Sequence, residues 1–401
     1  MTSIPTLLKR SLFLTSVAFS AISTVTAQPS NRAEQLGVPP ALDAPKPDAF
    51  DGPIIQLALL LDTSNSMDGL IDQARSRLWK IVNEIGEARI AGVAPQFQVS
   101  IFHYGNDGLP KKSDHVQLRA PFTTDLDIIS EQLFSLSTNG GQEYCGAVLR
   151  ECLSQLDWEE SPDDNTLQLI IIAGNEPFNQ GTEPYQEWTA AAKKRGILIN
   201  TVFCGNIEEG RKTLWADAAN QSGGTYASID QNQTEIQIPT PFDDVLERLN
   251  DSLNGTYLGY GSKGKKAKER QLAQDKSNST ASKNSFFSRM STKTTANYST
   301  SSWDIVSAVE EGQVKIKDLK ENDLPEELAS LEKEELEETI NNLAAERKRI
   351  QKEISAATIN RENFLNKALK EKADEQNGQD LDDVLIEAIK EQAESKGFTF
   401  E

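Results

Sequence analysis

Three oxygen-bearing side chains follow a short apolar run near residue 60. Residues 57–61 are apolar, Asp62 follows at once, and serines come two and four positions later, at Ser64 and Ser66. One carboxylate and two hydroxyls on alternate residues are ligands of the kind that a hard divalent cation prefers. The spacing predicts a cation site for Mg²⁺, with Mn²⁺ or Ca²⁺ as alternatives. The same side chains are also common helix caps, which is the plainer interpretation.

The elements around these residues predict an α/β domain. Apolar runs at 54–61, 97–102, 167–173 and 197–203 indicate strands, and amphipathic segments at 70–87, 126–136, 146–156 and 185–195 indicate helices. Continuous apolar strands separated by helices are typical of a mostly parallel sheet that is covered on both faces. Ligand sites in such sheets form beyond the carboxyl ends of the strands, which is where Asp62 lies.

The pattern D-x-S-x-S in this position resembles the metal-ion-dependent adhesion site (MIDAS) of the von Willebrand factor type A (VWA) family. That family completes its site with a second loop, often GG-T, and a third, often T-D-G. Here residues 139–146 read NGGQEYCG and residues 173–177 read AGNEP, so both loops depart from the pattern. The resemblance implies a Rossmann-like VWA domain at 54–261 with Glu143 or Gln142 as a further ligand, and with Asn175 or Glu176 in the third loop. We take Glu143 and Asn175 as the candidates.

The resemblance extends beyond the site to an exported bacterial branch of the family with a C-terminal helical region. It is carried by the segments at 140–146, 174–181, 201–205, 254–261, 301–308, 324–328 and 391–398.

The chain has three cysteines, too few for a disulfide scaffold. Cys145 and Cys152 are seven residues apart on one predicted helix, about 10 Å along its axis, and this is too far to bond. Any bridge therefore involves Cys204. Because Cys145 follows the second loop of the metal site that the resemblance implies, we consider a Cys145–Cys204 bridge, which would hold the Glu143 loop beside the cation. The alternative is a set of small buried thiols.

The two ends of the chain differ from the α/β domain in composition. Residues 1–27 combine Lys9 and Arg10, an apolar stretch and a small-residue site before Gln28, so we expect a signal peptide cleaved after Ala27 and a periplasmic or secreted protein. An uncleaved anchor is the alternative. Residues 28–53 form a Pro-rich linker.

Beyond the α/β domain, residues 262–300 are rich in Ser, Thr, Asn and Lys and predict a flexible linker. Residues 301–401 predict a charged helical or coiled-coil region. Apolar residues of this region follow a 4-3 spacing that only Arg347 interrupts, and this pattern predicts a surface for self-association. The residues are Leu336, Ile340, Leu343, Ile350, Ile354 and Ala357.

The composition restricts the classes of function. A net charge of −20 disfavours nucleic acid, and no segment of the mature chain is apolar enough to span a membrane. His103 and His115 do not lie beside a nucleophile motif. We therefore predict a binding protein rather than an enzyme: an adhesin or envelope adapter whose bound cation accepts a carboxylate from a protein partner. The alternatives are a scaffold that acts through its helical tail with a degenerate metal site, and a metal-assisted hydrolase.

Overall fold

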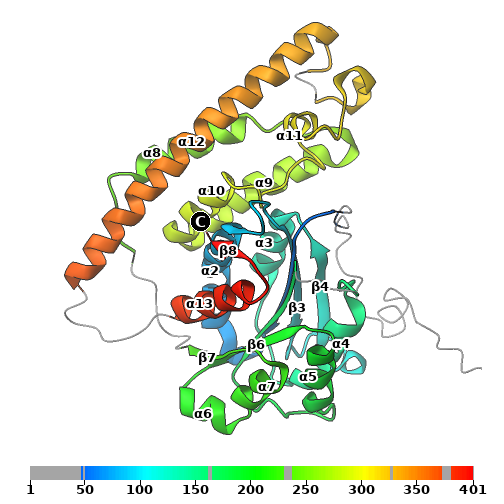
Figure 1. The fold of residues 1–401 in the computed structure, drawn as a ribbon, viewed down its shortest axis with the longest axis vertical. Helices are drawn as coiled ribbons and strands as arrows, with labels where there is room; N and C mark the ends of the chain where they lie inside the picture. The colour runs from blue at the N-terminus through cyan, green and yellow to red at the C-terminus, as the bar shows by residue number, and fades with distance from the viewer. Residues whose placement is uncertain are drawn as a thin grey trace, which may run out of the picture.

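The computed structural model describes residues 47, 50–160, 165–229, 237–325, 328–372 and 381–400. The predicted signal peptide (1–27) and nearly all of the Pro-rich segment (28–53) lie outside these residues. The described residues form a six-stranded sheet in the order β4-β3-β1-β5-β6-β7 (Figure 1). The strands are β1 (Ile54–Asp62), β3 (Gln96–Tyr104), β4 (Val116–Thr123), β5 (Thr166–Gly174), β6 (Leu198–Cys204) and β7 (Tyr226–Ile229).

The central strand β1 lies between β3 and β5 and is parallel to both. β6 and β7 continue the parallel arrangement, and β4 pairs with β3 in the antiparallel direction. The chain leaves β1 for β3 on one side and later returns to β5 on the other. The carboxyl end of β1 is therefore a topological switch point, where ligand sites form in open α/β sheets.

Helices cover both faces of the sheet, so the predicted fold class is confirmed. One face packs against α2 (Asp68–Gly86) and α3 (Leu126–Ser135), and the other packs against α4 (Cys145–Gln155), α5 (Tyr185–Lys194) and α7 (Trp215–Ser222). The short α6 (Ile207–Lys212) precedes α7. Side chains of β1 alternate between the two cores, with Leu57 and Leu59 on the α2 side and Ala58 and Leu60 on the α4 side. This double burial explains the uninterrupted apolar run.

A helical module follows β7 and differs from the sequence prediction. It contains α8 (Asp243–Gly255), α9 (Gly261–Ala281), α10 (Lys283–Thr292), α11 (Ile305–Glu310) and the long α12 (Lys333–Lys372). The prediction of a flexible linker at 262–300 is wrong, because α9 and α10 occupy most of this range and lie between α12 and the sheet domain (Figure 1).

The linker prediction failed because the contact of α9 and α10 with the sheet domain is largely polar. An argument from composition counts only the burial of apolar side chains. Arg289 on α10 is fully buried and forms ion pairs with Asp127 of α3 at 2.5 Å and with Asp275 of α9 at 2.7 Å. Lys293 is buried with them, 2.6 Å from Asp275. Buried polar groups can replace apolar ones where each finds a partner.

The apolar seam of α12 packs inside the chain. Leu336 and Ile340 contribute to a core with α11, while Ile350 and Ile354 contribute to a core with α8 and α10. Arg347, which interrupts the spacing, is buried in this seam with its guanidinium 2.7 Å from Asp304. These side chains are thus occupied within one molecule and do not leave a free coiled-coil surface.

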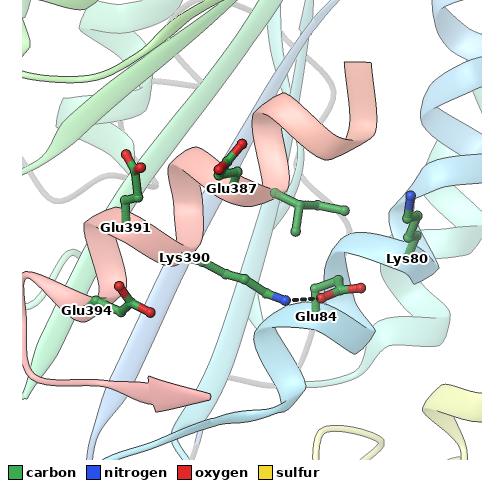
Figure 2. Close-up of a pocket in the computed structure, with 7 residues that line it drawn as sticks. Lys80, Glu84, Glu387, Lys390, Glu391 and Glu394 are labelled. Atoms are coloured by element: carbon green, nitrogen blue, oxygen red, sulfur yellow. Dashed lines mark hydrogen bonds and ion pairs between the residues drawn. The ribbon is translucent and has the colours of Figure 1, made fainter. Parts of the chain in front are cut away.

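The C-terminal segment returns to the sheet domain. Helix α13 (Leu381–Glu394) packs beside α2, and β8 (Thr399–Phe400) pairs with β2 (Ala88–Arg89). Ile389, Ala393 and Phe398 enter the core on the α2 side. A pocket of about 560 Å³ lies between α13 and α2. Figure 2 shows Lys390 of α13 paired with Glu84 of α2, near the exposed Glu387, Glu391 and Glu394. In the part of the chain that is described, no helix has the length and hydropathy needed to cross a membrane.

Candidate metal site

Asp62 ends β1 directly opposite the end of β3. It pairs in register with Tyr104, and the next residue, Thr63, donates its backbone N–H to the Tyr104 carbonyl at 2.9 Å. Gly105 then turns away with φ of +76°, and a Cβ there would lie 2.7 Å from Asp62 Oδ1 and 2.9 Å from the Glu143 Cγ. Glycine is therefore needed where these two carboxyl side chains are brought beside each other.

Ser64 and Ser66 lie in the turn that leads from β1 to α2. The Ser64 N–H donates to Asp62 Oδ1 at 2.8 Å, and the Oγ atoms of Ser64 and Ser66 are 3.2 Å apart. No side-chain cap hydrogen bond forms at the start of the 3₁₀ turn Asn65–Met67 or of α2. Helix capping, the plainer interpretation of this motif, is therefore wrong, and the two hydroxyls face each other.

Backbone hydrogen bonds hold the loop at 139–143 against this turn. The Asn139 N–H donates to the Thr63 carbonyl at 2.9 Å, and the Asn65 N–H donates to the Gly140 carbonyl at 3.0 Å. The side chain of Gln180 fixes the end of the loop, since its Oε1 accepts from the Glu143 N–H at 2.7 Å. The sequence pattern did not indicate Gln180, because only the fold brings it to this loop.

The third loop places Asn175 at the edge of the site. Its side-chain amide lies beside Ser66, whose Oγ is 3.1 Å from Nδ2 and 3.4 Å from Oδ1. The structure thus brings together all five predicted residues, Asp62, Ser64, Ser66, Glu143 and Asn175. Asn175 contacts the serine hydroxyl and is more exposed than the two carboxylates.

Two buried carboxylate oxygens of the site have no hydrogen-bond partner. They are Asp62 Oδ2 and Glu143 Oε2, on side chains that are 0% and 3% exposed. Burial, and then the neighbouring charge of Glu143, raise the pKa of Asp62 well above its ordinary value, and burial also raises the pKa of Glu143. Adjacent buried carboxylates repel each other unless a cation lies between them or a proton neutralises one. The donor set therefore fits a divalent cation.

Serine hydroxyls are essential to this donor set. Among the described residues, no group of three or more His, Cys, Asp or Glu side chains could hold a metal ion. Two carboxylates, two hydroxyls and water resemble the all-oxygen ligation of Mg²⁺ rather than the nitrogen and sulfur ligation of zinc. Asp62, Ser64, Ser66 and Glu143 would hold the ion, which would supply a positive centre for an incoming anionic group.

The cysteine bridge proposed from the sequence does not form. Cys145 packs in the core on the α4 side of the sheet, whereas Cys204 packs in the core on the α2 side. All three cysteines are buried free thiols. The Cys145 Sγ lies 3.7 Å from the Tyr104 hydroxyl, and burial raises the pKa of the thiol. This environment opposes thiolate formation and therefore nucleophilic chemistry.

His103 is a structural residue of β3. Its ring nitrogens lie 3.1 Å from Thr63 Oγ1 and 2.9 Å from Gln117 Oε1. Burial lowers the pKa of His103 to about 4. Both ring nitrogens are thus engaged by neighbouring side chains.

No family model and no curated protein matches the chain, whereas several solved structures are similar to it. BatB from Bacteroides thetaiotaomicron, described as a conserved hypothetical protein, is 16% identical with a TM-score of 0.34, over 44% of this chain and 90% of its own. The open form of the pilus adhesin SpaC from Lactobacillus rhamnosus GG is 14% identical with a TM-score of 0.35, over 45% of this chain and 28% of its own.

A third similar structure is proximal thread matrix protein 1 from the mussel byssus, with a zinc-occupied MIDAS motif. It is 13% identical with a TM-score of 0.33, over 45% of this chain and 43% of its own. The strand order and the two helical layers described above define a Rossmann-like α/β fold with an added helical module.

Proposed function

We propose that this chain is a binding protein that holds a divalent cation at the end of β1 and uses it to bind an acidic group on a protein partner. The observation that carries the proposal is the pair of unpartnered, buried oxygens Asp62 Oδ2 and Glu143 Oε2. Natural proteins rarely leave such atoms without a partner, since each costs about 1–3 kcal/mol or more when charged. A cation between them removes this cost.

An open coordination position gives the cation its role in binding. The protein supplies oxygens from the turn at 62–66 and from Glu143, and a carboxylate from the partner completes the shell. Such a bond is directional and depends on metal, as expected for the MIDAS that the sequence resembles. The signal peptide expected at residues 1–27 supports an activity outside the cytoplasm, and we propose an adhesion or envelope-adapter role there.

The scaffold alternative receives less support from the structure. It assigns the binding role to the helical tail, whose apolar residues pack against α8, α10 and α11 within one chain. The hydrolase alternative gains no support from His103, because both of its ring nitrogens have close structural neighbours.

The test is calorimetric titration of the full mature chain with MgCl₂ and MnCl₂, together with thermal melting in excess cation and in chelator. Wild type should show saturable heat and a higher Tm with cation, because a ligand at about 100 times its Kd adds about 2.7 kcal/mol to folding. Asp62→Ala and Ser66→Ala should lose both effects. Glu337→Gln, at an exposed position of α12, is the matched control. If wild type gives neither heat nor a Tm shift, the proposal is wrong.

A further inference from the structure

The rim of the metal site carries three acidic residues, one at the start of α2 and two on loops. Asp68 lies two residues after Ser66, and its carboxylate accepts a hydrogen bond from the Thr138 hydroxyl. Asp107 packs against Gly140, so closely that a Cβ on this glycine would clash with the Asp107 side chain. Glu176 follows Asn175 in the third loop and lies close to the Glu143 carboxyl. All three rim acids are partly or fully exposed.

The rim acids are not neutralised by the protein. Within the described ranges, Asp68, Asp107 and Glu176 form no ion pair. The four segments of the site, at 62–68, 105–115, 137–144 and 174–181, together carry six acids and two lysines, a net charge of −4. The lysines are Lys111 and Lys112. One of the acids, Asp114, pairs with Arg150 from outside these segments, and the surroundings of the open position stay negative when a divalent cation is bound.

A negative rim repels an anionic ligand unless the ligand also carries positive charge near its carboxylate. The cation attracts one carboxylate at contact distance, but the rim repels any further acid around it and attracts bases. Complementary charges of this kind determine which partners associate and how fast, and salt weakens their effect.

From this charge pattern, and resting on the proposed function, we infer that the partner presents its carboxylate among lysine or arginine residues. The acid binds the cation held beside Asp62 Oδ2 and Glu143 Oε2. The flanking bases pair with the rim acids Asp68, Asp107 and Glu176. A carboxylate within an acidic sequence is rejected although it offers the same ligand atom.

The test uses three fluorescent peptides of equal length with one central Asp, flanked by Lys, by Ser or by Glu. Fluorescence anisotropy measures their binding to the full mature chain in saturating MgCl₂. Two or three rim pairs at the strength of exposed ion pairs predict about tenfold tighter binding of the Lys peptide than of the Ser peptide, with the Glu peptide weakest. High NaCl should reduce the differences in affinity among the three peptides, and chelator should abolish the binding of all three.

Variants separate the rim from the cation. The triple variant Asp68→Asn, Asp107→Asn, Glu176→Gln should keep Mg²⁺ binding by calorimetry and lose the preference for the Lys peptide, whereas Glu337→Gln should retain it. If wild type binds Mg²⁺ but binds no peptide, or binds all three equally, the inference fails and the cation site stands. Equal binding of the Lys peptide by Asp62→Ala also overturns it. If wild type binds no Mg²⁺, the proposed function fails as well.

Discussion

The hydroxyl of Tyr104 fills the space where a side chain on Gly174 would lie. It donates to the Ala173 carbonyl at 3.0 Å, and a Cβ on Gly174 would be 2.7 Å from its oxygen and 3.1 Å from Asp62 Oδ2. The third loop of this chain therefore has no room for the aspartate that the VWA pattern often places there. The second carboxylate of the site comes from Glu143 in the second loop instead.

Gly174→Ala should lower the free energy of unfolding by about 1–3 kcal/mol, because the added methyl group overpacks this region. Tyr104→Phe should also destabilise, since it leaves the buried Ala173 carbonyl without its donor. The double variant should lose less than the sum, as expected for two groups in contact. Gly255→Ala is the control, because nothing lies within 4 Å of its Cβ position. Chemical denaturation measures the stability of the four variants. Additive losses of stability in the double variant would contradict the contact between Tyr104 and position 174.

Arg289→Met should destabilise the chain by about 3–5 kcal/mol, since it leaves Asp127 and Asp275 buried with less compensating charge. The matched control is Arg211→Ala, which breaks an exposed pair with Glu208 and should cost less than about 1 kcal/mol. Guanidinium chloride unfolding curves of the two variants provide the comparison. Equal midpoints would show that the polar interface between α10 and α3 does not hold the helical module in place.

Acidification should weaken the fold through His103. Its pKa is about 4 in the folded chain against an ordinary value of 6.5, so the unfolded chain binds more protons between these values. This contribution to stability is therefore present above about pH 6.5 and is lost as the pH falls toward 4.

His103→Gln should remove the part of the pH dependence that belongs to this group, up to about 3 kcal/mol between pH 7 and pH 4. Denaturant midpoints of wild type and variant at both pH values, in chelator, give the difference. If wild type and variant lose the same stability on acidification, His103 does not contribute to the pH dependence.

Phe398→Ala should destabilise by about 3–5 kcal/mol, because this side chain is 2% exposed and completes the core beneath α13. Phe364→Ala on α12 is the control, since that side chain is 40% exposed and its loss should cost under about 0.5 kcal/mol. Thermal melting compares the two. If Phe398→Ala behaves like its control, the C-terminal segment does not pack on the sheet domain as described.

The fold class could be predicted because its signal is local. Each parallel strand is buried on two faces and must be apolar throughout, and each covering helix must be amphipathic. The strands β4 and β7 were not predicted. β4 has half-buried positions along an edge of the sheet, and β7 is only four residues long, so neither has the continuous apolar run of the inner strands.

The sequence by itself determined the first half of the metal site. Asp62, Ser64 and Ser66 are neighbours along the chain, and the strand before them fixes where they lie. Only the tertiary structure decided that Glu143 meets Asp62 at a glycine turn and that Cys145 and Cys204 occupy opposite faces of the sheet. It also showed that residues 262–292 dock through a buried ionic network. Contacts between distant residues depend on strand order and helix packing, and neither composition nor spacing records these.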